Sequence, residues 1–405
     1  MKQTGINMEM VKKKNRASIL NFINQSGPIS RKDIANALGL TPAAVTQICA
    51  DLIMGGLLME TGTVVSENRA GRKKVLVDIN YEFKAVFGIN IESERTVIAL
   101  TNLNGEAKLI RALPTEKKRE PKSFLLMVAD CCMQMLKDAH LTLDAVAGIG
   151  VGITGIVNHE EGISVHAYGI WQEEVPIREI LNAYFKVPVV VENNVIAFSL
   201  AELLYGVGKE KDNLLFVKWG PGVGSAIIAD KKVYEGRKGK AAELGHFIVD
   251  KNGKQCSCGR RGCLETKISY AAIAEQFEKV FSKKDTPKLY EKMQGDFGNF
   301  NREYLMAHIN ELDAKLLNML DDMLDLFARA IVNCITILAP NRVVLCGALF
   351  QNEVLRSKII EDCSCYEPKY NGNKIIHTML SEREDYIGPA ALIVGAYMYG
   401  FDSVK

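Results

Sequence analysis

Apolar residues near the N-terminus recur at helical spacing, and residues that favour turns separate them. The first such segment, residues 15–24, predicts a helix. Its inward face is predicted to carry Ile19, Leu20, Phe22 and Ile23. Gly27-Pro28 then breaks the chain, which indicates that a second element begins soon afterwards.

Two further short helices are predicted, with a tight turn between them. Ser30, followed three positions later by Asp33, is close to a capping box, and Gly39 is suited to end that helix in the left-handed conformation. Thr41 is the next N-cap, with a proline at the first helical position. The inward residues are predicted to be Ile34, Ala35, Leu38, Val45, Ile48, Leu52 and Ile53. Two helices joined by a short glycine-containing turn predict a helix-turn-helix.

The outward face near the start of the last of these helices carries short or uncharged side chains. A helix that enters a major groove about 12 Å wide needs small residues for close approach and a few directed polar groups. Gln47 can pair with an adenine edge, while Ala43 and Ala44 can meet thymine methyl groups. The predicted DNA contacts of this segment are Thr41, Ala43, Ala44, Thr46 and Gln47. The alternative is a three-helix interaction domain that binds no DNA.

A two-stranded wing is predicted directly after this helix. Leu57–Val65 and Lys74–Asp78 are typical of strands, and the loop Ser66–Lys73 joins them. The loop residues expected to touch phosphates or the minor groove are Arg69, Arg72 and Lys73. Residues 1–80 carry 11 Lys and Arg against 6 Asp and Glu, a net charge of +5 in a chain whose total is +2. This basic excess favours nucleic acid as the partner of the N-terminal module.

Strands and helices alternate along the rest of the chain. Predicted strands lie in 85–112, with a turn at Asn104-Gly105, and at 145–151, 187–191, 214–218, 225–229 and 342–345. Predicted helices cover 122–138, 195–205, 315–338 and 388–399, and glycine-rich turns fall at 152–155 and 220–224. The order of three strands, a helix and a strand occurs twice, which predicts two related α/β lobes with a cleft between them. Ligands of such folds bind where strand ends face the cleft.

The composition is that of an ordinary globular protein. With 405 residues, 48% of them hydrophobic, the chain is long enough for two or three domains. No apolar run is long enough to span a membrane, and the first residues lack the apolar core of a signal peptide, so a cytoplasmic location is expected. Three of the ten cysteines crowd into residues 256–263, which favours metal or redox chemistry over a disulfide framework.

This cysteine cluster and a preceding histidine form the most specific motif of the chain. His246 is followed, after nine intervening residues, by Cys256, Cys258 and Cys263. One nitrogen and three sulfur donors are the ligand set of a closed, structural zinc site, which leaves no open position for a water nucleophile. Two glycines among the cysteines let the backbone fold tightly around a metal. The alternative is a set of free thiols, or a redox pair of Cys256 and Cys258.

From Asn80 to its end, the chain resembles the ROK family, which comprises repressors, open reading frames and sugar kinases. The block from Glu243 to Glu265 carries this resemblance, because it is similar to the family's zinc signature with its sugar-contacting glutamates. With the N-terminal module, the whole chain resembles the repressor branch, similar to xylose repressors. The resemblance implies an α/β fold: a winged helix-turn-helix before a two-lobed, actin-like and ribonuclease-H-like sugar kinase fold with structural zinc. The implied domains are residues 1–80 for DNA binding, 81–200 for lobe I, closed by a C-terminal helix at 386–405, and 201–385 for lobe II with the zinc site.

The resemblance also implies sugar contacts at matching positions. Glu243 and Glu265 match family residues that bind sugar hydroxyls, and His246 matches the residue that bridges zinc and sugar. In the kinases of the family, a Glu-Asn-Asp motif supplies a sugar-binding Asn and the Asp that acts as catalytic base. The plainer alternative for Glu243 is a polar turn residue that satisfies backbone groups.

Two departures from the kinase pattern affect the catalytic-base motif and the first phosphate loop. The kinase motif is here Glu192-Asn193-Asn194, in which Asn193 keeps the sugar role and Asn194, also a predicted sugar contact, cannot accept a proton from a hydroxyl. Asn193 has the same plainer alternative as a polar turn residue. The first phosphate loop of kinases is Asp-x-Gly-Gly-Thr, but here the stretch is Asn90-Ile-Glu92-Ser93, where side chains replace two glycines and Glu92 would repel a phosphate. The glycine loop at 220–224 remains.

Sugar contacts without the catalytic carboxylate predict a sensor and no enzyme. The expected function is a sugar-responsive transcription repressor of carbohydrate-utilisation genes, which binds operator DNA and a sugar effector as a homodimer or higher oligomer, away from membranes. The first alternative is an ATP-dependent ROK-type sugar kinase with an accessory DNA-binding domain. The second is a repressor with a vestigial pocket that a protein partner controls.

Overall fold

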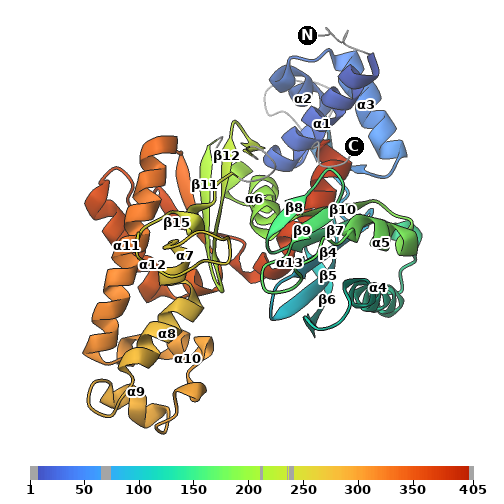
Figure 1. Cartoon of the computed structure of the whole chain (residues 1–405). Helices are drawn as coiled ribbons and strands as arrows, with labels where there is room; N and C mark the ends of the chain where they lie inside the picture. The colour runs from blue at the N-terminus through green and yellow to red at the C-terminus, as the bar shows by residue number, and fades with distance from the viewer. Residues whose placement is uncertain (1–7, 65–73, 210–212, 235, 237–240, 401–405) are drawn as a thin grey trace, which may run out of the picture. The chain divides into compact units, whose positions relative to one another are not determined.

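The computed structural model describes residues 8–64, 74–209, 213–234, 236 and 241–400 (Figure 1). These residues form two compact units. Unit 1 comprises the described residues of Met1–Tyr205 and Asp385–Lys405, and unit 2 comprises those of Gly206–Glu384. The finer division of unit 1 at residue 80 stays a prediction. Within the described ranges, no helix has the length and apolar character needed to cross a membrane.

The N-terminal part of unit 1 is the predicted winged helix-turn-helix. Its helices are α1 (Met8–Ser26), α2 (Arg31–Leu38) and α3 (Pro42–Met54). Its sheet has the order β1-β3-β2, built from β1 (Ile29–Ser30), β2 (Leu58–Val64) and β3 (Lys74–Ile79). The two-residue strand β1 was not predicted, because so short a segment carries no periodicity.

Local capping residues set the ends of α2 and α3, as the sequence indicated. The Ser30 hydroxyl accepts a hydrogen bond from the backbone N–H of Asp33 at 3.2 Å, and the Thr41 hydroxyl accepts one from Ala44 N–H at 3.3 Å. Gly39 ends α2 in the left-handed conformation, with φ of 64°. The Asp33 carboxylate also accepts a hydrogen bond from the Ser30 hydroxyl at 2.6 Å, so the two side chains bond to each other.

The core of this module corrects three of the predicted inward residues. Phe22, Leu38 and Ile53 are only half-buried, whereas Cys49 and the polar residue Asn24 are buried. On α1, Asn24 continues the buried stripe because it lies one helical turn after a buried leucine. A polar side chain at a core position requires partners elsewhere in the fold.

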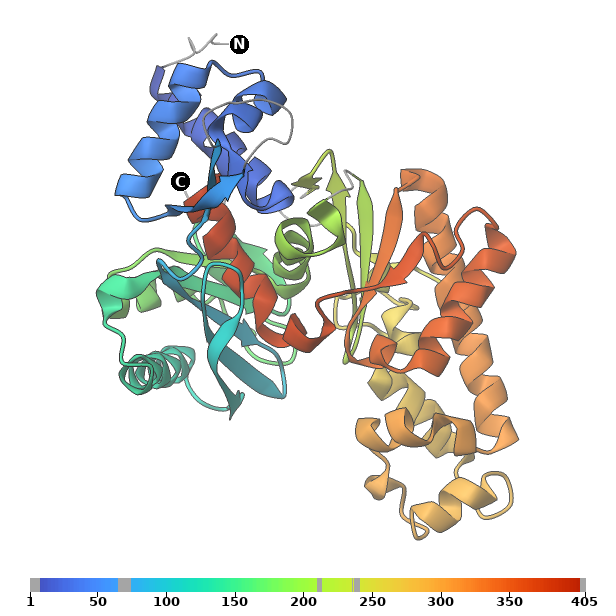
Figure 2. The same ribbon diagram turned by 180° about the vertical axis from the view of Figure 1, so that it is seen from behind.

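Each unit holds one five-stranded mixed sheet, and the two sheets have the same strand order (Figures 1 and 2). In unit 1 the order is β10-β7-β4-β5-β6, from β4 (Ala85–Ile91), β5 (Arg95–Thr101), β6 (Ala107–Pro114), β7 (Val146–Ile153) and β10 (Val189–Asn193). In unit 2 it is β13-β12-β11-β14-β15, from β11 (Leu214–Trp219), β12 (Val223–Ala229), β13 (Lys232–Val233), β14 (Arg342–Cys346) and β15 (Ile375–His377). In both, the first three strands in sequence are antiparallel and the last two add in parallel. The predicted pair of related α/β lobes is confirmed.

The helices of each unit were predicted only in part. Unit 1 contains α4 (Pro121–Asp138), α5 (Ile177–Phe185), α6 (Asn194–Tyr205), the hairpin β8 (Ile156–Asn158) and β9 (Ile163–His166), and α13 (Glu384–Val394), which continues as a π-helical turn at Gly395–Tyr399. Unit 2 contains α7 (Glu265–Ile268), α8 (Tyr270–Val280), α9 (Pro287–Lys292), α10 (Arg302–His308), α11 (Ala314–Leu338) and α12 (Glu353–Tyr366). The hairpin, α5, α7 to α10 and α12 were absent from the sequence interpretation.

Close packing of α13 on the sheet of unit 1 explains glycines in its central strands. A Cβ atom at Gly150 would lie 1.8 Å from the carbonyl oxygen of Pro389, and one at Gly88 would lie 2.6 Å from that of Tyr386. The predicted glycine-rich turn begins later than expected, because β7 continues through Gly152 to Ile153. The parallel strands β4, β7 and β10 therefore end side by side, and the residues that follow them share one edge of the sheet.

Candidate functional site

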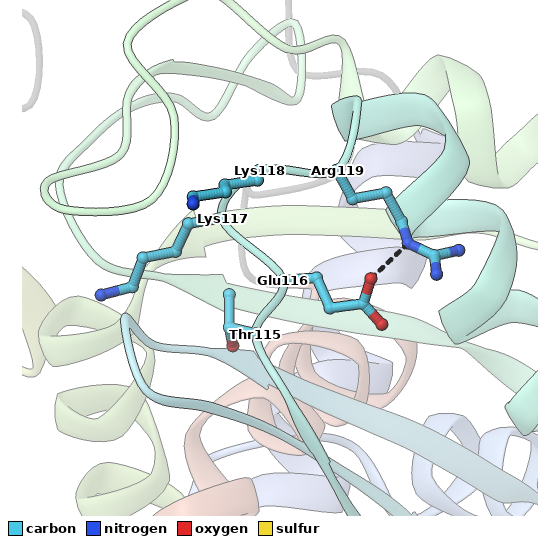
Figure 3. A pocket seen from close by; sticks show the side chains of 5 residues that line it. All are labelled: Thr115, Glu116, Lys117, Lys118 and Arg119. Atoms are coloured by element: carbon cyan, nitrogen blue, oxygen red, sulfur yellow. Dashed lines mark hydrogen bonds and ion pairs between the residues drawn. The ribbon is translucent and has the colours of Figure 1, made fainter.

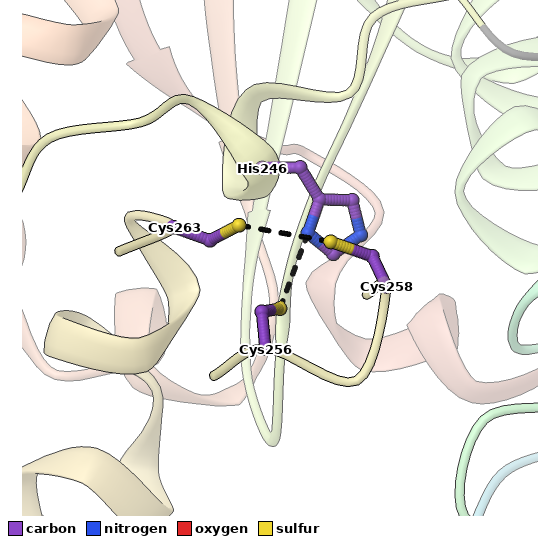
Figure 4. A group of neighbouring side chains, drawn as sticks. All are labelled: His246, Cys256, Cys258 and Cys263. Atoms are coloured by element: carbon purple, nitrogen blue, oxygen red, sulfur yellow. Dashed lines mark hydrogen bonds between the residues drawn. The ribbon is translucent and has the colours of Figure 1, made fainter. Parts of the chain in front are cut away.

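The four predicted metal ligands of unit 2 converge on one point (Figure 4). The ligand atoms of His246, Cys256, Cys258 and Cys263 all lie within 4.8 Å of one another. Cys256 Sγ is 3.6 Å from His246 Nδ1, and Cys258 Sγ is 3.6 Å from Cys263 Sγ. All ten cysteines, which fall within the described ranges, are free thiols. The cluster has the composition and the spacing of a metal-binding site.

The donor set fits a tetrahedral ion. Metal–sulfur bonds of ~2.3 Å and metal–nitrogen bonds of ~2.0–2.1 Å imply donor separations of roughly 3.6–3.8 Å, close to the 3.6 Å separations here. Burial and the neighbouring Cys258 and Cys256 thiols raise the pKa of Cys263 to about 12. A cation would offset this cost by favouring the thiolate forms that bind it.

A carboxylate holds the far side of the histidine ring. Glu243 Oε2 lies 3.4 Å from His246 Nε2, while Nδ1 of the same ring faces the cysteines. Such a carboxylate fixes the ring orientation and the tautomer of a metal-bound histidine. His246 is buried, but the Glu243 side chain is 43% exposed, so its carboxylate can meet both the ring and a solvent-borne ligand. The turn-residue alternative for Glu243 receives no support from these contacts.

Glu265 is half-buried and contacts the glycine loop. It begins α7, and its Oε2 atom accepts a hydrogen bond from Val223 N–H at 2.9 Å. A Cβ atom at Gly222 would lie 2.7 Å from that same oxygen, which explains the glycine. The Glu265 carboxylate therefore accepts from a backbone N–H of the glycine loop, the kind of group with which such a loop binds a phosphate.

Three side chains meet where the parallel strands of unit 1 end. Glu92, Thr154 and Asn194 directly follow β4, β7 and β10. Asn194 Nδ2 donates to Glu92 Oε1 at 3.0 Å and lies 3.4 Å from Thr154 Oγ1. The two departures from the kinase pattern are thus hydrogen-bonded to each other, and an amide supplies the donor that a carboxylate at position 194 could not. The nearby buried Asn90 Oδ1 has no hydrogen-bond partner among the described residues.

Asn193 makes mostly backbone contacts. Its amide oxygen accepts from Val195 N–H at 2.8 Å and Ile196 N–H at 3.3 Å, which caps the start of α6. Its amide nitrogen donates to the carbonyl oxygen of Gly155 at 2.8 Å. The turn-residue alternative accounts for these bonds, and the sugar role of Asn193 stays a prediction. Among the predicted sugar contacts, Asn193 and Asn194 belong to unit 1, and Glu243, His246 and Glu265 belong to unit 2.

The predicted recognition helix α3 presents a short-residue surface. Thr41, Ala43, Thr46 and Gln47 are exposed, and Ala44 is half-buried. Thr46 Oγ1 donates to the Pro42 carbonyl oxygen at 2.7 Å, and Gln47 Nε2 donates to Asp51 Oδ1 at 2.8 Å. No other partner within the described ranges engages the Gln47 amide, so its oxygen and second proton remain for a base edge. The predicted wing contacts Arg69, Arg72 and Lys73 lie outside the described residues.

A hollow of about 630 Å³ on unit 1 is distinct from the predicted sites (Figure 3). It is lined by residues 115–119, which join β6 to α4. Arg119 Nε forms an ion pair with Glu116 Oε2 at 2.6 Å, while Lys117 and Lys118 are exposed. None of the predicted sugar, metal or DNA contacts lines it.

Comparisons with known proteins match both the N-terminal module and the two-lobed part of the chain. A family model described as "ROK family" matches residues 86–395, and one described as "Winged helix-turn-helix DNA-binding" matches residues 13–59. The chain is 25% identical to the xylose repressor of Bacillus subtilis (strain 168), over 96% of this chain and 97% of that protein. It is 26% identical to the solved structure of a ROK family transcriptional regulator, a homolog of the E. coli MLC protein, with a TM-score of 0.81 over 96% of this chain and 97% of that one. A ROK family glucokinase from Streptomyces griseus, in complex with glucose and AMPPNP, shares the fold at 18% identity and a TM-score of 0.65, over 76% and 98% of the two chains.

The hydrogen bond between Asn194 and Glu92 allows a test of whether the chain lacks sugar kinase activity. We expect Asn194→Asp to make no phosphorylated sugar, and to lower the free energy of unfolding at neutral pH by about 1–3 kcal/mol, because two carboxylates would meet at hydrogen-bond distance. The folded state would then hold a proton more tightly than the unfolded state, so the destabilisation should shrink as the pH falls. Denaturant unfolding across pH and ³¹P NMR of sugar and ATP mixtures measure both effects.

The double variant Glu92→Gln with Asn194→Asp is the matched control. It restores a hydrogen bond between an amide and a carboxylate at these two positions, so it should recover most of the lost stability. An Asn194→Asp single variant that is as stable as the parent, or that makes sugar phosphate, would contradict this account.

Proposed function

The chain belongs to the ROK family, and from that premise we propose that it is a sugar-responsive, DNA-binding transcription repressor of carbohydrate-utilisation genes. The observation that carries the proposal is that one chain combines an exposed recognition helix with a sugar-kinase-like fold. In that fold the position of the kinase catalytic base is an amide, Asn194, which is hydrogen-bonded to Glu92. Full-length similarity to proteins named as a repressor and a transcriptional regulator supports the same function. An amide has no basic oxygen that could take a hydroxyl proton at neutral pH, so we propose no kinase activity.

The sugar contacts are proposed residue by residue. Glu243 and His246 offer a carboxylate and an imidazole nitrogen beside the cysteine cluster, and Asn194 offers an amide at the strand ends of unit 1. Asn193 and Glu265 are retained as contacts through the family resemblance, in addition to the backbone bonds that they make. Because one relative is named for xylose, free aldopentoses are the first effectors to examine.

We propose that the cysteine cluster binds one structural Zn²⁺ ion. His246 Nδ1 and the thiolates of Cys256, Cys258 and Cys263 would hold it, since three sulfurs and one nitrogen suit zinc. When bound, the ion would cross-link the loop that carries His246. It would provide no reactive water. Glu243 would keep the imidazole oriented from the opposite side.

The operator would be contacted by α3 and the wing of two chains. Helix-turn-helix proteins bind half-sites about one helical turn apart, so we propose a homodimer or a higher homo-oligomer. Thr41, Ala43, Ala44, Thr46 and Gln47 would face the major groove, with Arg69, Arg72 and Lys73 of the wing on phosphates or the minor groove.

Operator binding across a sugar panel tests this function. The full chain would first select DNA from a random-sequence library, and its affinity for that DNA would then be measured with each sugar. We expect one sugar to weaken operator binding by about 5- to 150-fold, a coupling of ~1–3 kcal/mol, with no phosphorylated product when ATP is present. Turnover of ATP with any panel sugar would support the kinase alternative, and unchanged operator affinity with every sugar and sugar phosphate would refute sugar sensing.

Gln47 provides a sharper test of the DNA contact. We expect Gln47→Ala to weaken binding to the selected operator by about 5- to 150-fold, because a base pair loses a directed contact of ~1–3 kcal/mol. The slope of log affinity against log salt should not change, since no phosphate contact is removed. Fluorescence anisotropy at several salt concentrations measures both quantities, and equal losses on operator and random DNA would exclude base recognition by Gln47.

A further inference from the structure

Asn24 is a buried junction between the winged module and the lobe of unit 1. It lies on α1 and is 8% exposed. Its Nδ2 atom donates to the Leu204 carbonyl oxygen at 3.0 Å, and its Oδ1 atom accepts from the Tyr81 hydroxyl at 3.0 Å. Burial raises the pKa of Tyr81 to about 12, so the hydroxyl keeps the proton that it donates. One amide thus joins α1, the segment between β3 and β4, and the last turn of α6.

The helix that Asn24 contacts begins at the candidate sugar site. α6 starts at Asn194, whose amide donates to Glu92, and its final turn contains Leu204. The last four carbonyl groups of a helix lack partners within the helix, so Asn24 satisfies one of them. At 1.5 Å per residue the helix spans about 18 Å. It therefore connects two functional elements that are far apart in the sequence.

Close packing along α6 favours its motion as one body. At the middle of α6, a Cβ atom on Gly388 would lie 2.7 Å from Phe198 N, so the backbone of α13 approaches α6 closely there. Nine of its residues are buried. A displacement at Asn194 cannot be absorbed by loose side chains, because packed interiors transmit strain.

The opposite half of α1 borders empty space. A cavity of about 380 Å³ is lined by Lys12 and Arg16 of α1, by Asp51 and Leu52 of α3, and by Tyr397 near the C-terminus. Lys12 forms an exposed ion pair with Asp51 at 3.1 Å. The half of α1 that carries Asn24 is thus bonded to α6, while its first half borders a cavity shared with α3.

We propose that the Asn24–Leu204 hydrogen bond transmits sugar binding to the operator-binding helix. The inference rests on the proposed function. A sugar that replaces Glu92 or Thr154 as the partner of the Asn194 amide shifts the start of α6, and the shift moves the Leu204 carbonyl away from Asn24. Without that bond, α1 and α3 lose the orientation that fits DNA. Asn24 is thus a positioning residue that contacts neither sugar nor DNA.

Asn24→Asp tests the proposal because it removes the donor to Leu204 and keeps an acceptor for Tyr81. We expect operator affinity without sugar to fall by about 2- to 13-fold, the factor for a net hydrogen bond of ~0.5–1.5 kcal/mol. Operator affinity with saturating sugar should not change. Sugar affinity of the operator-bound protein should rise by the same factor, because the coupling is reciprocal and sugar no longer has to break the bond. A merely structural role would not tighten sugar binding.

Two variants serve as controls for this measurement. Tyr81→Phe keeps the Asn24–Leu204 bond and should keep the full sugar effect on the operator. Gln25→Ala changes an exposed neighbour that bonds only locally, to Asn21, and should behave as the parent. If Asn24→Asp does not fold, Asn24→Leu removes the same donor with an apolar side chain of similar size, and Tyr81→Phe accounts for the acceptor that it also removes.

The outcomes distinguish a failure of the proposed function from a failure of the proposed role of Asn24. A parent protein whose operator affinity ignores every sugar overturns the proposed function itself. A parent that responds, together with an Asn24→Asp variant that responds to the same extent, overturns the role of Asn24 alone. Weaker sugar binding in Asn24→Asp also overturns it, because that result indicates general damage to the fold.

Discussion

Replacing Cys263 by serine is expected to empty the metal site and to destabilise unit 2. Metal content should fall from about one ion per chain to near zero, because a tetrahedral site loses one of its sulfur ligands. The loss of a structural ion should lower the free energy of unfolding by at least about 4 kcal/mol, which corresponds to roughly 8–16 °C in Tm for a domain of this size. Elemental analysis and calorimetry of the full chain measure both changes.

Cys365→Ser is the matched control for this prediction. Cys365 is exposed and stands apart from the cluster, so its loss should change neither metal content nor Tm. Chelator treatment of the parent should reproduce the Cys263→Ser result, and added Zn²⁺ should reverse it. A Cys263→Ser chain that keeps its ion, or a parent purified without any bound metal at full stability, would contradict the structural metal site.

The second large effect is expected at Glu243, which faces both the histidine and solvent. Glu243→Gln keeps the size of the side chain but removes its charge, so sugar affinity should fall by about 12- to 160-fold, the factor for a charged hydrogen bond of ~1.5–3 kcal/mol. Metal content should be retained, since the four ligand atoms are untouched. Isothermal titration with the sugar found on the panel, beside elemental analysis, provides the two readouts.

Glu278→Gln serves as the control, because Glu278 is an exposed acid on α8 away from the cluster. It should bind sugar and metal as the parent does. If Glu243→Gln loses metal and keeps its sugar affinity, Glu243 is a positioning residue for His246 and the proposed sugar contact is wrong.

Features that depend on adjacent residues were predictable from the sequence. The caps at Ser30, Gly39 and Thr41 were placed correctly, because each rests on bonds within four residues. The cysteine cluster was also predictable, since three of its ligands lie within eight positions and their types restrict the chemistry. The repeat of strands, helix and strand was predicted from long periodic segments, but the short strands β13 (Lys232–Val233) and β15 (Ile375–His377) were not placed. Its edges moved by a few residues where strands continue through glycines such as Gly152.

Features that depend on distant partners were not predictable. Glu92 and Asn194 were each identified as departures from the kinase pattern, but their bond joins positions 102 residues apart. Asn24 lies 180 residues from Leu204, and its only signal in the sequence was a polar residue on the apolar stripe of a helix. Gly222 is required by the approach of Glu265, which only the fold reveals.

The central claim is that binding of the effector sugar and binding of operator DNA weaken each other in one chain, which transfers no phosphoryl group. Its most direct test is the affinity of the full chain for its effector sugar, measured with and without saturating operator. The account predicts that operator weakens sugar binding by the same factor by which sugar weakens operator binding, because the coupling is reciprocal. Equal sugar affinity in both conditions would contradict the account.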